Sequence, residues 1–211
     1  MELNKLLQQA AVAHQQGKLD EAERLYRDIL KTEPKHPETT HNLGILIDSQ
    51  KKSDEALELF KTATEEKPNI KQFWISYTNA LINGNKIDIA EAACRKSIEI
   101  NPSIPIIFFN LGILFYKVNK LEEAEKNFKK AIELKPDYAE AYSNLGATLN
   151  NLGKLFDAVT NYKKAIELKP DYIEAYSNLG NVLRELARFE EAEVNCRKAI
   201  ELKPDFAEAH F

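Results

Sequence analysis

The sequence contains few of the residues that staple small domains or carry redox chemistry. Only two cysteines occur among 211 residues, with one methionine, one tryptophan and seven glycines. Cys94 and Cys196 occupy the same place in a repeated pattern, so they would lie on different layers, too far apart for a disulfide within one chain. We interpret both as small buried apolar residues rather than as metal ligands or redox groups.

The chain also lacks a positive charge excess and long apolar runs. Its formal net charge is −4 at pH 7, whereas nucleic-acid-binding proteins usually carry a basic excess that displaces counterions from phosphates. No run of about 18 apolar residues occurs, and the N-terminus begins directly in a polar helical pattern. We therefore expect a cytoplasmic protein that binds neither nucleic acid nor membrane.

Catalytic and metal-binding motifs are missing as well. The four histidines, His14, His36, His41 and His210, show no spacing typical of metal ligands. Gly-x-Ser-x-Gly and phosphate-binding glycine loops do not occur. The sequence therefore predicts no catalytic residue, no metal and no cofactor in this chain.

What the sequence does contain is a strict 34-residue period. Six alanines and six prolines keep this step: Ala22, Ala56, Ala90, Ala124, Ala158 and Ala192, and Pro34, Pro68, Pro102, Pro136, Pro170 and Pro204. Each repeat holds two stretches with apolar residues at helical spacing, such as Tyr142, Leu145 and Leu149. Such a period is typical of solenoids, whose units must stack to bury their apolar faces.

Turn-forming residues separate the two stretches of each repeat. Gly153 can adopt the left-handed conformation that ends a helix, and so can Gly17, Asn85 and Asn119 at equivalent positions. Lys51 and Ala187 are less suited, so we expect more strained or differently shaped turns there. Asp residues before the first stretches, followed three residues later by Glu, predict capping boxes: Asp137 with Glu140, Asp171 with Glu174, and Asp205 with Glu208.

Small residues recur where two helices of a repeat would approach closely. Gly146 and Ala158 permit this approach in the fifth repeat, and Gly44, Gly112 and Gly180 recur at the first of these positions. Thr78 replaces the glycine in the third repeat, which we expect to pack more loosely.

The combination Tyr142-x-x-Leu145-Gly146-x-x-Leu149, Ala158, Tyr162, Ala165 and Pro170 resembles the tetratricopeptide repeat, and neighbouring repeats match in phase. The resemblance implies an all-α, right-handed α-solenoid with first helices on the concave face and second helices on the convex face. We predict one array over 1–211, with six helix-turn-helix units and the start of a seventh: 3–36, 37–70, 71–104, 105–138, 139–172, 173–206 and 207–211.

Family geometry also implies which first-helix side chains face the groove. At the sixth position stand Asn42, Asn110, Asn144 and Asn178, a candidate ladder for a peptide backbone similar to that in the repeats of O-linked N-acetylglucosamine transferase. Alternatively, these asparagines brace adjacent helices. Repeats three and four place apolar residues on the same face, a candidate contact patch: Ile75, Ile82, Ile106, Phe109, Ile113 and Tyr116.

These patterns favour a protein-interaction scaffold that binds an extended peptide or a partner helix in the concave groove. An alternative is the substrate-recruiting arm of a larger glycosyl-, methyl- or sulfotransferase, since residues 207–211 start a further repeat. A third hypothesis is self-association through the uncapped last repeat.

Overall fold

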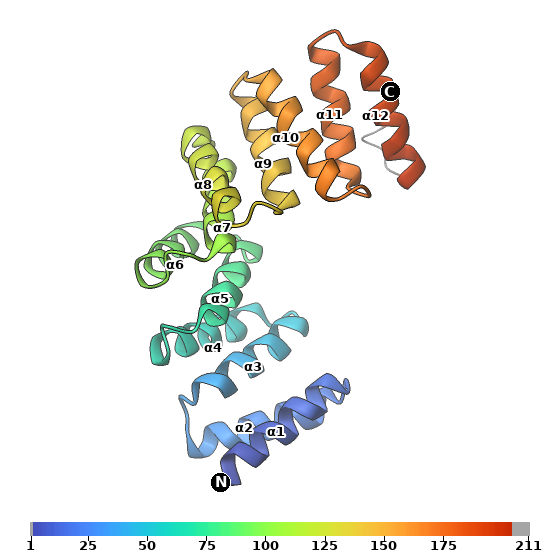
Figure 1. The fold of residues 1–211 in the computed structure, drawn as a ribbon. Coiled ribbons are helices and arrows are strands. Elements are labelled where there is room, and N and C mark those ends of the chain that lie inside the picture. Colours follow the sequence, from blue (N-terminus) through green and yellow to red (C-terminus); the bar gives the residue numbers. More distant parts are fainter. Residues whose placement is uncertain (1, 204–211) are drawn as a thin grey trace. The chain divides into compact units, whose positions relative to one another are not determined.

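The structure is a computed structural model that describes residues 2–203. Every regular element in that range is an α-helix, as the sequence predicts (Figure 1). The chain divides into two compact units, residues 1–110 and residues 111–211. Each unit is described by itself below, and the single continuous array stays a prediction.

The first unit is built from helix pairs that correspond to the first three repeats. The pairs are α1 (Glu2–Gln15) with α2 (Leu19–Thr32), α3 (Pro37–Ser49) with α4 (Ser53–Glu66), and α5 (Lys71–Asn83) with α6 (Ile87–Ile100). The second helix of one pair also packs on the first helix of the next, α2 on α3 and α4 on α5. Helix α7 (Pro105–Lys117) contributes residues to both units.

The second unit repeats this arrangement. Its further helices are α8 (Leu121–Leu134), α9 (Ala139–Asn151), α10 (Leu155–Leu168), α11 (Ile173–Glu185) and α12 (Phe189–Leu202). Helix α8 packs on α9, α9 on α10, α10 on α11, and α11 on α12 (Figure 1). The second helices of all six repeats begin 34 residues apart, from Leu19 to Phe189, so the sequence period is the structural period.

All six turns within the repeats adopt the same left-handed conformation. The residues and φ angles are Gly17 (73°), Lys51 (62°), Asn85 (54°), Asn119 (59°), Gly153 (72°) and Ala187 (56°). In each turn the next residue donates its N–H five residues back, as Lys154 N does to Leu149 O at 2.9 Å. Lys51 and Ala187 therefore do not form differently shaped turns; they adopt the common shape at a steric cost.

The repeated glycines of the first helices lie against a large side chain of the second helix. A Cβ atom at Gly44 would lie 2.8 Å from Phe60, at Gly112 2.7 Å from Phe128, and at Gly146 2.9 Å from Tyr162. In repeat three, Thr78 is buried and the residue equivalent to these aromatics is the smaller Cys94. Helices α5 and α6 are in less extensive contact than α3 with α4 or α9 with α10, as the threonine predicts.

The expected aspartate caps are wrong. Helix α9 starts at Ala139 with Tyr138 at its N-cap, and α11 starts at Ile173 with Tyr172 there; neither cap has a side-chain hydrogen bond. Asp137 and Asp171 lie in the turns that precede these helices. Tyr138 N donates to Lys135 O, and Tyr172 N donates to Lys169 O. Because of these turn hydrogen bonds, each helix begins one residue later than the sequence predicts. Asp205 and Glu208 lie outside the described residues.

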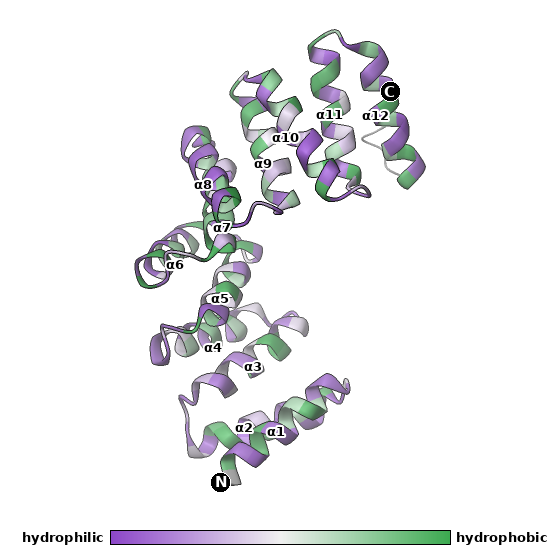
Figure 2. Ribbon diagram, in the orientation of Figure 1, coloured by the Kyte–Doolittle hydropathy of each residue, from purple (hydrophilic) through white to green (hydrophobic). Residues whose placement is uncertain are grey.

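Apolar and polar residues are mixed along most helices (Figure 2), and the apolar residues supply the buried core. The largest fully buried side chains include Trp74, Tyr26, Tyr162 and Phe128. Cys94 and Cys196 are buried free thiols, which confirms their interpretation as core residues. Burial raises the pKa of Cys94 to about 12, so its thiol is unreactive at neutral pH.

Candidate functional site

We define the first-helix face of each unit as the surface formed by the second, fifth, sixth, ninth, twelfth and thirteenth positions of its first helices: α1, α3 and α5 in the first unit, α9 and α11 in the second, with α7 contributing residues to both. Contacts between successive first helices show that these positions meet. In the first unit, His41 Nε2 on α3 lies 2.9 Å from Ser76 Oγ on α5. In the second unit, Asn151 Nδ2 on α9 donates to Tyr116 Oη on α7 at 3.0 Å.

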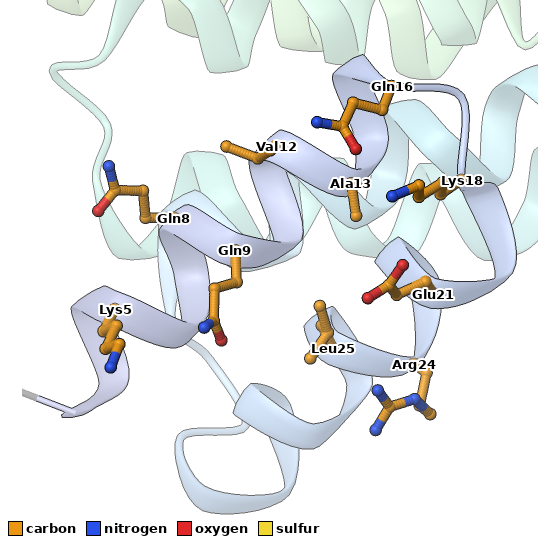
Figure 3. Close-up of a pocket in the computed structure, with 10 residues that line it drawn as sticks. All are labelled: Lys5, Gln8, Gln9, Val12, Ala13, Gln16, Lys18, Glu21, Arg24 and Leu25. Atoms are coloured by element: carbon orange, nitrogen blue, oxygen red, sulfur yellow. The ribbon is translucent and has the colours of Figure 1, made fainter.

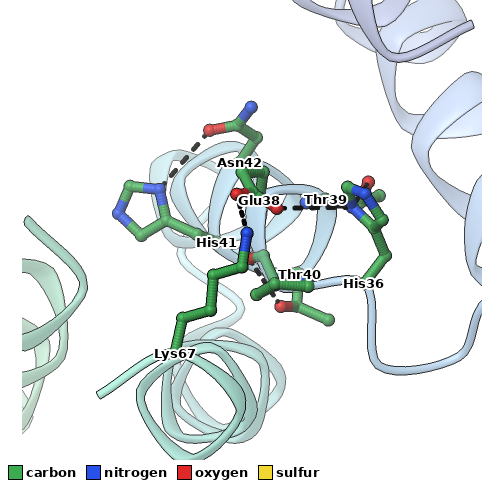
Figure 4. A network of polar contacts seen from close by, with 8 residues as sticks. His36, Glu38, Thr39, Thr40, His41, Asn42 and Lys67 are labelled. Carbon is green, nitrogen blue, oxygen red and sulfur yellow. Dashed lines mark hydrogen bonds and ion pairs between the residues drawn. The ribbon is translucent and has the colours of Figure 1, made fainter. Parts of the chain in front are cut away.

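A polar network covers the α3 part of the face in the first unit (Figure 4). His41 is buried, its ring lies 4.7 Å from that of Phe73, and its Nδ1 lies 3.4 Å from Asn42 Oδ1. Burial lowers the pKa of His41 below its ordinary value of 6.5. The imidazole is therefore a neutral bridge between repeats two and three.

The start of α3 carries the rest of this network. His36 caps the helix, because its Nδ1 accepts a hydrogen bond from Thr39 N at 3.3 Å. Glu38 at the second position forms a 2.6 Å ion pair with Lys67 (Figure 4). The ion pair is internal to repeat two, so the charges at this corner of the face already pair with each other.

The four asparagines of the predicted ladder differ in what they contact. Asn110 is only 4% exposed, and its Nδ2 donates to Thr78 Oγ1 at 3.1 Å and to Asn79 Oδ1 at 2.7 Å. It braces two helices, the alternative left open by the sequence, and does not present its amide to a ligand. Asn42 is half-buried and contacts His41 and, by a hydrogen bond, Tyr26.

The two asparagines of the second unit retain more hydrogen-bonding capacity. Asn144 donates one N–H to Glu140 O on its own helix at 2.8 Å, and its Oδ1 has no hydrogen-bond partner among the described residues. Asn178 is half-buried and its amide has no hydrogen-bond partner within residues 2–203. The ladder stays a prediction, with its available groups on α9 and α11.

The apolar candidates are less exposed than a contact patch requires. In the first unit, Ile82 is buried, and Ile75, Ile106 and Phe109 are half-buried. In the second unit, Ile113 and Tyr116 are half-buried. Because they belong to separate units, the contiguous patch stays a prediction. The sequence analysis did not select Ile45, which is 40% exposed at the ninth position of α3. It could have been selected because it occupies the same repeat position as Ile113.

One end of the face in the second unit is hollowed. Asn150, Asn181, Arg184 and Glu185 line an open depression of about 580 Å³ between α9 and α11. Asn181 Oδ1 accepts a hydrogen bond from Arg184. Asn150 Oδ1 is buried without a hydrogen-bond partner among the described residues. The depression thus combines amides, a guanidinium and a carboxylate, a set suited to polar recognition.

Neither a metal-binding cluster nor a membrane-spanning helix occurs among the described residues. Residues 2–203 contain no cluster of three or more His, Cys, Asp or Glu side chains that could hold a metal ion. Among the described helices, none has both the length and the apolar character needed to cross a bilayer.

Comparison with solved structures shows the fold. The chain is similar to PilW, a widely conserved type IV pilus biogenesis factor, with TM-score 0.83, 21% identity and coverage of 99% of this chain and 97% of that one. The chain is also similar to PilF of Pseudomonas aeruginosa, with TM-score 0.82, 15% identity and coverage of 98% of this chain and 94% of that one. A third similar structure is YrrB, a tetratricopeptide-repeat protein with an unusual peptide-binding site. Its TM-score is 0.68 and its identity 21%, with coverage of 87% of this chain and 95% of that one.

The comparisons do not show the finer resemblance to the repeats of O-linked N-acetylglucosamine transferase, and they lend no support to a transferase arm. No curated protein matches the sequence. One family model, the cilia and flagella-associated protein 70 C-terminal domain, matches residues 1–210. With its paired helices, its 34-residue period and this match over nearly its whole length, the chain belongs to that family of tetratricopeptide-repeat domains.

Proposed function

We propose that the chain is a protein-interaction module and that the first-helix face of its second unit binds an extended peptide segment of a partner. The observation that supports this most strongly is the unpaired amide of Asn178, at the same repeat position as Asn144 with its unpaired Oδ1. A half-buried polar group without a partner is costly unless a ligand or water satisfies it.

Amides suit this task because each offers both donors and an acceptor. Asn144 and Asn178 can therefore pair with the C=O and N–H groups of a peptide regardless of its side chains. YrrB, which has the same fold, contains a peptide-binding site, which adds support. Binding through the backbone predicts affinity for several unrelated sequences.

Selectivity would come from the residues beside the amides. Tyr116 accepts a hydrogen bond from Asn151, which fixes its ring at the α9 edge, and Ile113 lies one turn earlier on α7. These two apolar side chains provide a contact for an apolar ligand residue. At the other end, the depression with Arg184 and Glu185 would contact a charged or amide side chain.

The test is a selection of random dodecapeptides on the immobilised protein, followed by fluorescence anisotropy with several unrelated binders. Asn144→Ala with Asn178→Ala should weaken all of them by a similar factor, roughly thirtyfold, because each of the two lost hydrogen bonds is worth about 1 kcal/mol. Ile113→Asp should weaken them unequally.

The matched control uses asparagines of the second helices. Asn161 Nδ2 and Asn195 Nδ2 each donate to a carbonyl four residues back at 2.8 Å, as Asn144 does. Asn161→Ala with Asn195→Ala therefore removes the same type of helix contact from another surface. Equal affinities in the two double variants would reject the proposed site.

A further inference from the structure

The first repeat has an uncovered outer face, formed by the sides of α1 and α2 that do not pack on α3. A depression of about 530 Å³ lies there between the two helices (Figure 3). Its lining residues are Lys5, Gln8, Gln9, Val12, Ala13, Gln16, Lys18, Glu21, Arg24 and Leu25. We call this surface the outer face of repeat one.

The other repeats show what normally covers this position. Val12 is 44% exposed, whereas its counterparts are nearly inaccessible: Leu46 (0%), Ala80 (6%), Thr148 (0%) and Val182 (1%). Each counterpart lies on a first helix against which the second helix of the preceding repeat packs, α2 on α3, α4 on α5, α8 on α9 and α10 on α11. The outer face of repeat one is thus shaped to receive a helix.

Charges on the covered repeats show which helix fits. The carboxylate of Glu125, at the fifth position of α8, pairs at 2.7 Å with Lys154, which precedes α10. Although burial opposes ionisation, hydrogen bonds from Lys129 and Lys154 hold the pKa of Glu125 below its ordinary value of 4.5. The acid at the fifth position of one second helix thus meets the base at the start of the next.

A second type of ion pair, of opposite polarity, also joins successive second helices. Arg27, at the ninth position of α2, pairs at 2.7 Å with Glu55 at the third position of α4. The equivalent residues Lys163 and Glu191 lie 3.7 Å apart in the second unit. The acid is thus supplied by α8 and the base by α2 and α10; a second helix that carried both would present an acid and, four residues later, a base to the repeat that it covers.

Repeat one carries both receiving charges. Lys18 stands at the position of Lys154, and Glu21 at the position of Glu55. In Figure 3 both side chains point into the depression. No cross-repeat ion pair of either type involves Lys18 or Glu21 among the described residues, so residues 2–203 do not supply their complement.

We propose that the outer face of repeat one binds an amphipathic helix of a partner protein that carries Glu-x-x-x-Arg or Glu-x-x-x-Lys. The glutamate of this helix contacts Lys18 and its base contacts Glu21. Its apolar stripe covers the exposed Val12. This surface shares only Gln8 with the first-helix face, so the chain would engage two different segments of its partners.

The probe is a synthetic helix with the sequence of residues 121–134, held helical by a hydrocarbon staple, which carries Glu125 and Lys129 at the required spacing. Its affinity for the full chain is measured by fluorescence anisotropy. Lys18→Glu with Glu21→Lys keeps the net charge unchanged and should weaken binding roughly tenfold, since two attractive pairs become repulsive. A peptide with Glu125→Lys and Lys129→Glu should bind this variant better than it binds the original chain.

The control variant is Glu58→Lys with Lys61→Glu, the same exchange at the same spacing on the exposed side of α4; it should bind the probe as the original chain does. Equal affinity for the original chain and the Lys18/Glu21 variant, or no binding at millimolar peptide, would overturn the proposal. So would sedimentation showing that the chain self-associates and that the Lys18/Glu21 variant does not, because the occupant would then be a second copy.

Discussion

At the scale of single residues, the chain shows how a common backbone shape overrides local preference. Ala187 and Lys51 adopt positive φ angles of 56° and 62° that glycine or asparagine supplies in the other repeats. A left-handed conformation costs a residue with a Cβ atom roughly 1–2 kcal/mol. Packing of the helix pair on both sides of each turn therefore imposes the conformation.

Ala187→Gly should stabilise the protein by about 0.5–1 kcal/mol, because relief of this strain exceeds the entropy that glycine loses on folding. The reciprocal change Gly153→Ala should destabilise it by a similar amount. Nothing lies within 4 Å of a Cβ built on Gly153, so only backbone conformation changes. Urea unfolding measures the stability of both variants. An Ala187→Gly variant that is less stable than the original protein would contradict backbone strain at Ala187.

His41 makes stability depend on pH. Burial lowers its pKa below 6.5 in the folded protein, so below about pH 6.5 the unfolded chain binds the extra proton more readily, and stability falls as the pH decreases. His41→Gln keeps a polar partner for Ser76 but cannot titrate. Between pH 7.5 and 5.5 its melting temperature should therefore fall less than that of the original protein. Parallel losses in both proteins would show that His41 does not carry this dependence.

At the scale of helices, repeats two, four and five each pack a first-helix glycine against an aromatic side chain of the second helix. Gly146→Ala places a methyl group 2.9 Å from the Tyr162 ring and should destabilise the protein by about 1–3 kcal/mol, as overpacking does. Thermal unfolding checks this. In a Tyr162→Ala background, which removes the ring, the penalty should shrink; an unchanged penalty would mean that contact with the ring is not its cause.

The helices also show which structural features could be predicted from the sequence. Periodicity predicts their number and spacing because each repeat faces the same packing problem. It did not predict where α9 begins, since Tyr138 N bonds to Lys135 O and moves the cap beyond Asp137. Nor did it distinguish Asn110 from Asn178, because burial of Asn110 depends on Thr78 and Asn79 of another repeat.

At the scale of the whole molecule, repetition supplies the alignment that a single sequence otherwise lacks. Comparing one repeat with another identifies groups whose usual partner is missing, such as Asn178 on the first-helix face and Lys18 on the outer face of repeat one. The pairing of Glu125 with Lys154 could not be recognised in advance, because Glu125 also has Lys129 within reach on its own helix.

The most direct test of the account is nuclear magnetic resonance of side-chain amides during titration with a selected peptide. The account predicts that the NH₂ signals of Asn144 and Asn178 shift on binding, while those of Asn161 and Asn195 on the second helices do not. Shifts confined to Asn161 and Asn195, or unchanged signals from Asn144 and Asn178 at saturation, would contradict peptide binding on the first-helix face.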